Sequence, residues 1–229
     1  HAIPRRQRQM CIRDRNTSDR SERLIRSLRV QPLLVVLRPD ANDFQSALPH
    51  TRLCRQLDQL AEAGVLHVEL AWTADPGWAD LVMDLKCRHP QLQLGAASIT
   101  ELSALEQVAE LDISYAMSPL LDPALQDRAV ALDCLLVPGV MTPSEIRQAA
   151  KLGCRLVKLF PASVLGCAFR QQIAVPMGAL PFLIAAGGLR AKDLSPWLCA
   201  GYDAIALGRT VFEDDQLDPS LAAWLSDQW

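Results

Sequence analysis

The chain has 229 residues, half of them apolar, and its formal net charge is −3. This length and apolar content suit one globular domain with a sizeable core, and the small net charge gives no indication of a nucleic-acid partner. No apolar run approaches the roughly 20 residues that a membrane-spanning helix requires, and the N-terminus lacks the apolar stretch of a secretory signal. Together these features predict a cytoplasmic protein without a membrane partner.

The spacing of cysteine and histidine argues against disulfides and metal ligation. The seven cysteines lie far apart and never form a C-x-x-C pair, which is typical of reduced thiols in a cytoplasmic protein. The four histidines are not at ligand spacing, so we expect no metal site.

The first 29 residues differ in charge from the rest, because they hold nine arginines against three acids. A basic arm can bind nucleic acid, but residues 6–14 resemble translated sequencing-adapter sequence. We therefore predict a disordered or non-native arm over residues 1–17, followed by one domain over residues 18–229. A short amphipathic helix should begin that domain, with Leu24, Ile25 and Leu28 on one face.

Strand-like apolar runs and helical patterns then alternate along the chain. The expected strands are 33–37, 67–71, 92–96, 113–117, 134–137, 156–160, 182–185 and 204–207. The expected helices are 51–63, 76–88, 99–111, 123–132, 143–152, 191–200 and 219–229. Several of these helices begin with a capping residue followed by proline, at Asp75-Pro76, Asp122-Pro123, Thr142-Pro143 and Asp218-Pro219.

This alternation predicts an α/β fold. Eight strands separated by helices indicate a parallel sheet, and continuous apolar runs indicate that both faces of the sheet are covered. Eight such units in about 200 residues favour a single (β/α)8 TIM barrel. A doubly wound open sheet is the alternative, but no Gly-x-Gly-x-x-Gly follows the first strand.

The run at 156–160 contains a lysine among apolar residues. Burial would lower the pKa of Lys158, and a free amine at a strand end can attack a ketone to form a Schiff base. A lysine that reaches the surface from the end of its strand is the alternative interpretation. In a barrel, however, the C-terminal strand ends are where functional residues gather.

Other strand ends carry matching features. Glu69 lies among apolar neighbours, so it either pairs with a surface arginine or has a raised pKa that suits proton transfer. Gly187-Gly188 and Gly208-Arg209 follow the last two strands, where glycines let backbone amides approach a phosphate. Two ordinary tight turns are the alternative interpretation of these glycines.

Over about residues 24–215 the chain resembles the class I aldolases of 2-keto-3-deoxy-6-phosphogluconate (KDPG) and 4-hydroxy-2-oxoglutarate (KHG). The resemblance rests on Glu69 and on the segments Val157–Ser163, Gly95–Thr100, Ser118–Leu121, Val137–Glu145 and Ala186–Gly188. It implies a homotrimer that uses no cofactor and acts on a small 2-keto acid, which we expect to be phosphorylated.

The chain departs from the family pattern at several substrate contacts. Relatives carry an arginine or threonine shortly after the glutamate to hold the substrate carboxylate, and here Thr73 is left for that role. Ser98 keeps the hydroxyl of the family's threonine, Ala186 loses one, and Arg209 stands where relatives have serine.

The resemblance implies that Lys158 forms the Schiff base and that Glu69 moves protons. Phe160 and Pro119 would wall the pyruvyl pocket, while Gly187, Gly188, Gly208 and Arg209 would hold phosphate. The expected reaction cleaves KDPG to pyruvate and glyceraldehyde 3-phosphate. KHG, cleaved to pyruvate and glyoxylate, is a second candidate substrate. The alternatives are a non-catalytic phosphate-binding barrel, or a sugar-phosphate isomerase or epimerase that uses Lys158 only as a charge.

Overall fold

The computed structural model describes residues 19–45 and 50–227, so the predicted arm over residues 1–17 lies outside the described part. Nine parallel strand segments form one sheet in the order β5-β4-β3-β2-β1-β9-β8-β7-β6. Their bounds are β1 Leu33–Leu37, β2 His67–Ala71, β3 Gln93–Ala97, β4 Tyr115–Met117, β5 Leu136–Val137, β6 Gly139–Val140, β7 Leu156–Leu159, β8 Phe182–Ala186 and β9 Ala204–Leu207.

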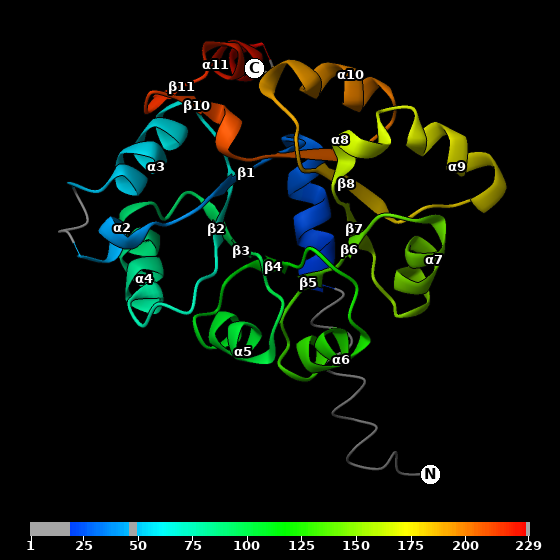
Figure 1. The fold of residues 1–229 in the computed structure, drawn as a ribbon, viewed down its shortest axis with the longest axis horizontal. Helices are drawn as coiled ribbons and strands as arrows, with labels where there is room; N and C mark the ends of the chain where they lie inside the picture. Colours follow the sequence, from blue (N-terminus) through cyan, green and yellow to red (C-terminus); the bar gives the residue numbers. More distant parts are fainter. Residues whose placement is uncertain (1–18, 46–49, 228–229) are drawn as a thin grey trace.

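The sheet closes because β5 and β6 are two pieces of one extended run, interrupted at Pro138. β5 pairs with β4 and β6 pairs with β7, so the two ends of the strand order are joined by the chain itself. The result is the predicted barrel, and in Figure 1 its helices form an outer ring around the strands. The doubly wound alternative is excluded.

The helices that the sequence predicted are present, mostly shortened by one to three residues. They are α3 Arg52–Glu62, α4 Trp78–Arg88, α5 Leu102–Glu110, α6 Pro123–Ala131, α7 Pro143–Lys151, α10 Leu194–Cys199 with a preceding 3-10 turn Ala191–Asp193, and α11 Pro219–Ser226. None of the described helices is long and apolar enough to cross a membrane.

The proline-associated caps explain where these helices begin. Thr142 forms a full capping box, in which its hydroxyl accepts from the Glu145 amide and the Glu145 carboxylate accepts from the Thr142 amide. Asp75 is the exception, because its carboxylate accepts from the Gly77 amide in a turn, and α4 begins only at Trp78.

Several short elements were not predicted. They are α2 Ala41–Gln45, α8 Ala162–Leu165, α9 Phe169–Met177, a 3-10 turn Arg209–Val211 and a hairpin of β10 Phe212–Glu213 with β11 Gln216–Leu217. α9 contains Pro176 and lies between glycines in the left-handed region, Gly166 and Gly178, so its sequence resembles a loop.

The N-terminal end of the barrel is closed by the helical residues 19–30, drawn in dark blue in Figure 1. The predicted apolar face is confirmed, because Leu24, Ile25 and Leu28 are buried among the first interior side chains of the strands. Polar groups fasten this helix, since the Ser27 hydroxyl lies 2.8 Å from Nε2 of His67 and accepts from Nε2 of Gln93 at 2.7 Å. The interior is therefore accessible from the C-terminal strand ends.

Candidate active site

Lys158 lies inside the barrel on β7, paired in register with Gly139 on β6 and Ile184 on β8. Its side chain is buried at 7% exposure, so the alternative of a surface lysine is wrong. Burial lowers the pKa of Lys158, and the positive charge of Arg38 adds to this effect while the carboxylate of Glu69 opposes it. The position therefore favours a free amine at a lower pH than usual.

Glu69 lies on β2, also inside the barrel, and is 1% exposed. Burial raises its pKa to about 7, and the positive charge of Lys158 works against this rise. Its Oε1 has no hydrogen-bond partner among the described residues, and no ion pair with a surface arginine is seen in that part of the chain. The alternative in which Glu69 pairs with a surface arginine is therefore not supported. The Glu69 carboxyl can both take and release a proton near neutral pH.

Arg38 is a third charged group at this site, and no role was predicted for it from the sequence. It follows β1, and its Nη1 donates to the hydroxyl of Ser98 at 3.2 Å. Ser98 itself adopts a left-handed conformation, with φ of 65°, directly after β3. No carboxylate pairs with Arg38 in the described ranges, so its guanidinium is free to bind an anion. Its position at the end of a strand was the signal that could have identified it.

Thr73, the residue left for holding the substrate carboxylate, lies in a turn after β2. Its hydroxyl accepts a hydrogen bond from the Asp75 amide at 3.3 Å, within the turn that precedes α4. The neighbouring Trp72 donates to the amide oxygen of Gln107 on α5. Nothing described here brings Thr73 to Lys158 or Glu69, whereas Arg38 interacts electrostatically with Lys158.

The loops after β7 and β8 pack closely around the lysine. The Nζ atom of Lys158 lies 5.5 Å from the ring centroid of Phe160. Gly187 adopts φ of 95°, and a Cβ there would lie 2.9 Å from the Phe160 ring. A Cβ at Gly188 would lie 2.1 Å from the hydroxyl of Ser163. Glycine is therefore required at both positions, and the two loops hold Phe160 against the amine.

Pro119 lies on the adjoining side of the barrel, in the loop after β4. A Cβ at Gly139, at the start of β6, would lie 2.3 Å from the backbone carbonyl carbon of Pro119. Gly139 is the register neighbour of Lys158. The backbone of Pro119 thus packs next to the strand that flanks the lysine.

Gly208 and Arg209 line a cavity of about 600 Å³ at the C-terminal ends of β9 and β1. Arg38 and Arg52 line the same cavity, and so do the acidic residues Asp214 and Asp215, so three arginines and two aspartates contribute to its lining. Among the described residues the Arg209 side chain makes no hydrogen bond or ion pair, and a 3-10 turn starts with this residue. This arrangement agrees with an anion site that also adjoins Arg38.

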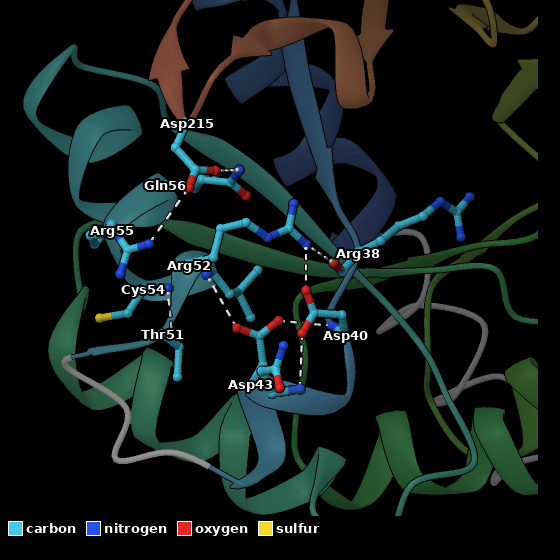
Figure 2. Close-up of polar contacts among 11 residues, drawn as sticks. Arg38, Asp40, Asp43, Thr51, Arg52, Cys54, Arg55, Gln56 and Asp215 are labelled. Carbon is cyan, nitrogen blue, oxygen red and sulfur yellow. Dashed lines mark hydrogen bonds and ion pairs between the residues drawn. The ribbon is translucent and has the colours of Figure 1, made fainter.

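Arg52 was not identified from the sequence, because an arginine at the start of a helix is unremarkable there. Its Nη2 atom donates to the carboxylate of Asp40 at 3.0 Å and lies 3.5 Å from the backbone oxygen of Arg38. Figure 2 shows Arg52 beside Asp40, while the Arg38 side chain extends away from that pair. These contacts hold the loop after β1 to α3 and so fix the position of the Arg38 backbone.

The model of the family described as KDPG and KHG aldolase matches residues 25–221. The chain belongs to the KDPG and KHG aldolase family. It is therefore an aldolase, which is a lyase, and the isomerase alternative is excluded.

Curated relatives and solved structures agree with this family. The 2-dehydro-3-deoxy-phosphogluconate aldolase of Dickeya dadantii is 26% identical over 80% of this chain and 81% of its own. The 2-dehydro-3-deoxy-6-phosphogalactonate aldolase of Escherichia coli is 23% identical over 81% and 86%. The KDPG aldolase of Legionella pneumophila, solved with pyruvate captured as a covalent carbinolamine, has a TM-score of 0.69 at 17% identity over 88% and 93%.

Proposed function

We propose that the protein is a Schiff-base aldolase in which Lys158 is the nucleophile and Glu69 the proton carrier. The observation that supports this most strongly is the pair of groups inside the barrel, an amine and a carboxyl that are both buried and interact with each other. Burial favours the neutral form of each, so an amine and a carboxylic acid coexist closer to neutral pH than free side chains would.

The reaction starts from the free amine of Lys158 and uses Glu69 as a carboxylate, a form that its pKa of about 7 makes accessible near neutral pH. The free amine of Lys158 attacks the C2 ketone of a 2-keto-4-hydroxy acid, and loss of water gives an iminium whose positive charge accepts electrons. Glu69 as carboxylate takes the proton of the C4 hydroxyl, the C3–C4 bond breaks, and an aldehyde leaves. The remaining enamine is protonated at C3 and hydrolysed to pyruvate, which frees the lysine. Because the iminium is the electron sink, the cycle needs no organic cofactor or metal. The carbinolamine captured in the Legionella relative is the kind of adduct that this mechanism requires.

The substrate carboxylate would bind to Arg38 rather than to Thr73. Arg38 carries the charge that Thr73 lacks, has no acidic partner among the described residues, and acts on Lys158. Its guanidinium can donate two parallel hydrogen bonds to a carboxylate. Ser98, to which Arg38 donates, would hold the guanidinium in position.

The other end of the substrate would carry a phosphate. Gly187, Gly188 and Gly208 offer backbone amides without side chains, and Arg209, whose side chain has no acidic partner among the described residues, adds positive charge at the cavity. We propose KDPG as the preferred substrate, giving pyruvate and glyceraldehyde 3-phosphate, with KHG as a poorer one. We also propose a homotrimer on the strength of the family resemblance, which light scattering in solution can check.

Reductive trapping tests the proposed function. The protein is incubated with pyruvate and borohydride, and peptide mass spectrometry locates the added mass. We expect the adduct on Lys158, no adduct in Lys158→Met, and an unchanged circular dichroism spectrum for that variant. If Lys158 stays unmodified in the folded wild-type protein, the Schiff-base assignment is wrong and the non-catalytic alternative takes its place.

A further inference from the structure

Tyr115 lies inside the barrel beside Glu69, and the proposed mechanism does not yet use it. It is the first residue of β4, is 0% exposed, and pairs in register with Gly95, which in turn pairs with Glu69. A Cβ at Gly95 would lie 2.4 Å from Cε2 and Cζ of the Tyr115 ring. The ring therefore lies across Gly95, and its hydroxyl end extends toward the strand that carries Glu69.

Two polar atoms are left without partners at this place. The hydroxyl of Tyr115 and Oε1 of Glu69 are both buried, and neither makes a hydrogen bond to any described residue. A buried polar atom without a partner costs about 1–3 kcal/mol, so two of them near each other are expected to share a ligand that bonds to both. A water molecule can do so, because it accepts from a phenol and donates to a carboxylate in the same geometry.

The charges around Glu69 are compatible with such a link. Lys158 faces it from β7, Tyr115 faces it from β4, and Arg38 at the end of β1 acts on Lys158. His67, two residues earlier on β2, is bonded instead to Ser27 at the closed end of the barrel. Burial and the negative charge of Glu69 raise the pKa of Tyr115 well above its usual value, so the phenol keeps its proton and acts as a donor.

We propose that Tyr115 is a positioning residue whose hydroxyl, through one shared water molecule, holds the Glu69 carboxylate in the orientation that takes the substrate proton. The proposal rests on the function proposed for Glu69. In this arrangement Gly95 has to be a glycine, because a side chain there would collide with the Tyr115 ring. The proposal also explains why a phenol, and not a plain aromatic ring, occupies an otherwise apolar interior position.

Titration of the Glu69 carboxyl tests this link without relying on catalysis. Protein labelled with ¹³C at glutamate carboxyls is titrated by NMR, and the Glu69 signal is assigned by its loss in Glu69→Gln. A donor stabilises the carboxylate, so Tyr115→Phe should raise the pKa of Glu69 by at least about half a unit, or threefold in proton affinity. The acidic limb of kcat/KM against pH should move up equally. Tyr202→Phe is the matched control, because Tyr202 is a buried tyrosine that packs on Trp197 outside the site, and it should shift neither.

Two outcomes would overturn the proposal. One is an unchanged Glu69 titration in Tyr115→Phe, with a melting temperature equal to or above that of the wild type, because a hydroxyl without any partner only costs stability. The other is a high-resolution crystal structure of the wild-type protein with no water within hydrogen-bond distance of both the Tyr115 hydroxyl and Glu69. Pyruvate trapping on Lys158 decides the proposed function separately, so the two failures are distinguishable.

Discussion

Two layers of polar side chains lie inside the barrel, and they differ in how completely they are hydrogen-bonded. At the closed end, His67 is bonded on both ring nitrogens, to the Ser27 hydroxyl at 2.8 Å and the Leu33 carbonyl at 3.2 Å. Two residues further along β2, Glu69 has an oxygen with no partner among the described residues and an amine as its charged neighbour.

This difference in hydrogen bonding distinguishes a structural residue, His67, from a candidate catalytic residue, Glu69, on the same strand. Both side chains are almost completely buried, and burial favours the neutral form of each. It lowers the pKa of His67 to about 4 and raises the pKa of Glu69 to about 7. The complete hydrogen bonding of His67 fastens the N-terminal helix and leaves nothing for a ligand. The incomplete bonding of Glu69 leaves an atom that a substrate or water can reach, which is common at functional sites.

The sharpest way to break the comparison is to change Glu69. Glu69→Gln keeps the shape but removes the proton acceptor, so the rate of aldol cleavage should fall roughly 10²–10⁴-fold. Reductive trapping of pyruvate on Lys158 should persist, because imine formation still has its amine. A spectrophotometric assay of pyruvate release measures the first effect, and mass spectrometry the second. Near wild-type cleavage in this variant would remove Glu69 from the mechanism.

Arg38 gives the next largest effect. Hydrogen bonds to charged groups contribute about 1.5–3 kcal/mol, so Arg38→Ala should raise the KM of every 2-keto acid substrate roughly 10–100-fold. The charge of Arg38 lowers the pKa of Lys158. Loss of Arg38 should therefore raise the Lys158 pKa that is seen in the dependence of the rate on pH. Arg88→Ala, which breaks an ion pair with Asp58 on the outer helices, is the control. Thr73→Val with a larger rise in KM than Arg38→Ala would restore the role first expected of Thr73.

Arg209 should act on one substrate and not on another. Arg209→Ala is expected to raise the KM of KDPG about tenfold, since one charged hydrogen bond to phosphate is lost. KHG has no phosphate, so its KM should change little and serves as the internal control. Parallel assays of the two substrates measure the ratio. Equal changes for both substrates would place Arg209 outside the phosphate site.

The sequence predicted the fold closely because the barrel strands are bounded apolar runs. The expected bounds of β1, β2 and β9 match the structure residue for residue. α9 was missed because it contains Pro176 and ends at a glycine, two features of loops. The fifth strand was expected over 134–137, but it starts later, at Leu136, and a second segment at 139–140 follows Pro138, which cannot donate to the ladder.

The same reasoning explains which site residues could be found. Lys158 and Glu69 were identified because a charge inside an apolar run is conspicuous. Arg38 was not assigned a role, since an arginine after a strand is ordinary until its freedom from ion pairs is known. Tyr115 passes for an apolar strand residue, and only the space above Gly95 reveals where its hydroxyl lies.

The smallest effect on activity, and the one that tests the closed end, concerns His67. Its pKa is about 4 in the folded protein and about 6.5 when unfolded, so the unfolded chain binds more protons between these values. The contribution of His67 to stability is therefore fully present above pH 6.5 and is lost as the pH falls toward 4, by roughly 3 kcal/mol in all.

Urea unfolding of the wild type and of His67→Gln across this pH range isolates the effect, because Glu69 and the surface carboxylates titrate in both proteins. The difference in free energy of unfolding between wild type and variant should shrink steadily from pH 6.5 to 4, while kcat at neutral pH stays within a few-fold. A difference that does not change with pH would mean that His67 is protonated in the folded barrel. In that case the hydrogen bonds at the closed end would hold a charge, and the contrast with Glu69 would disappear.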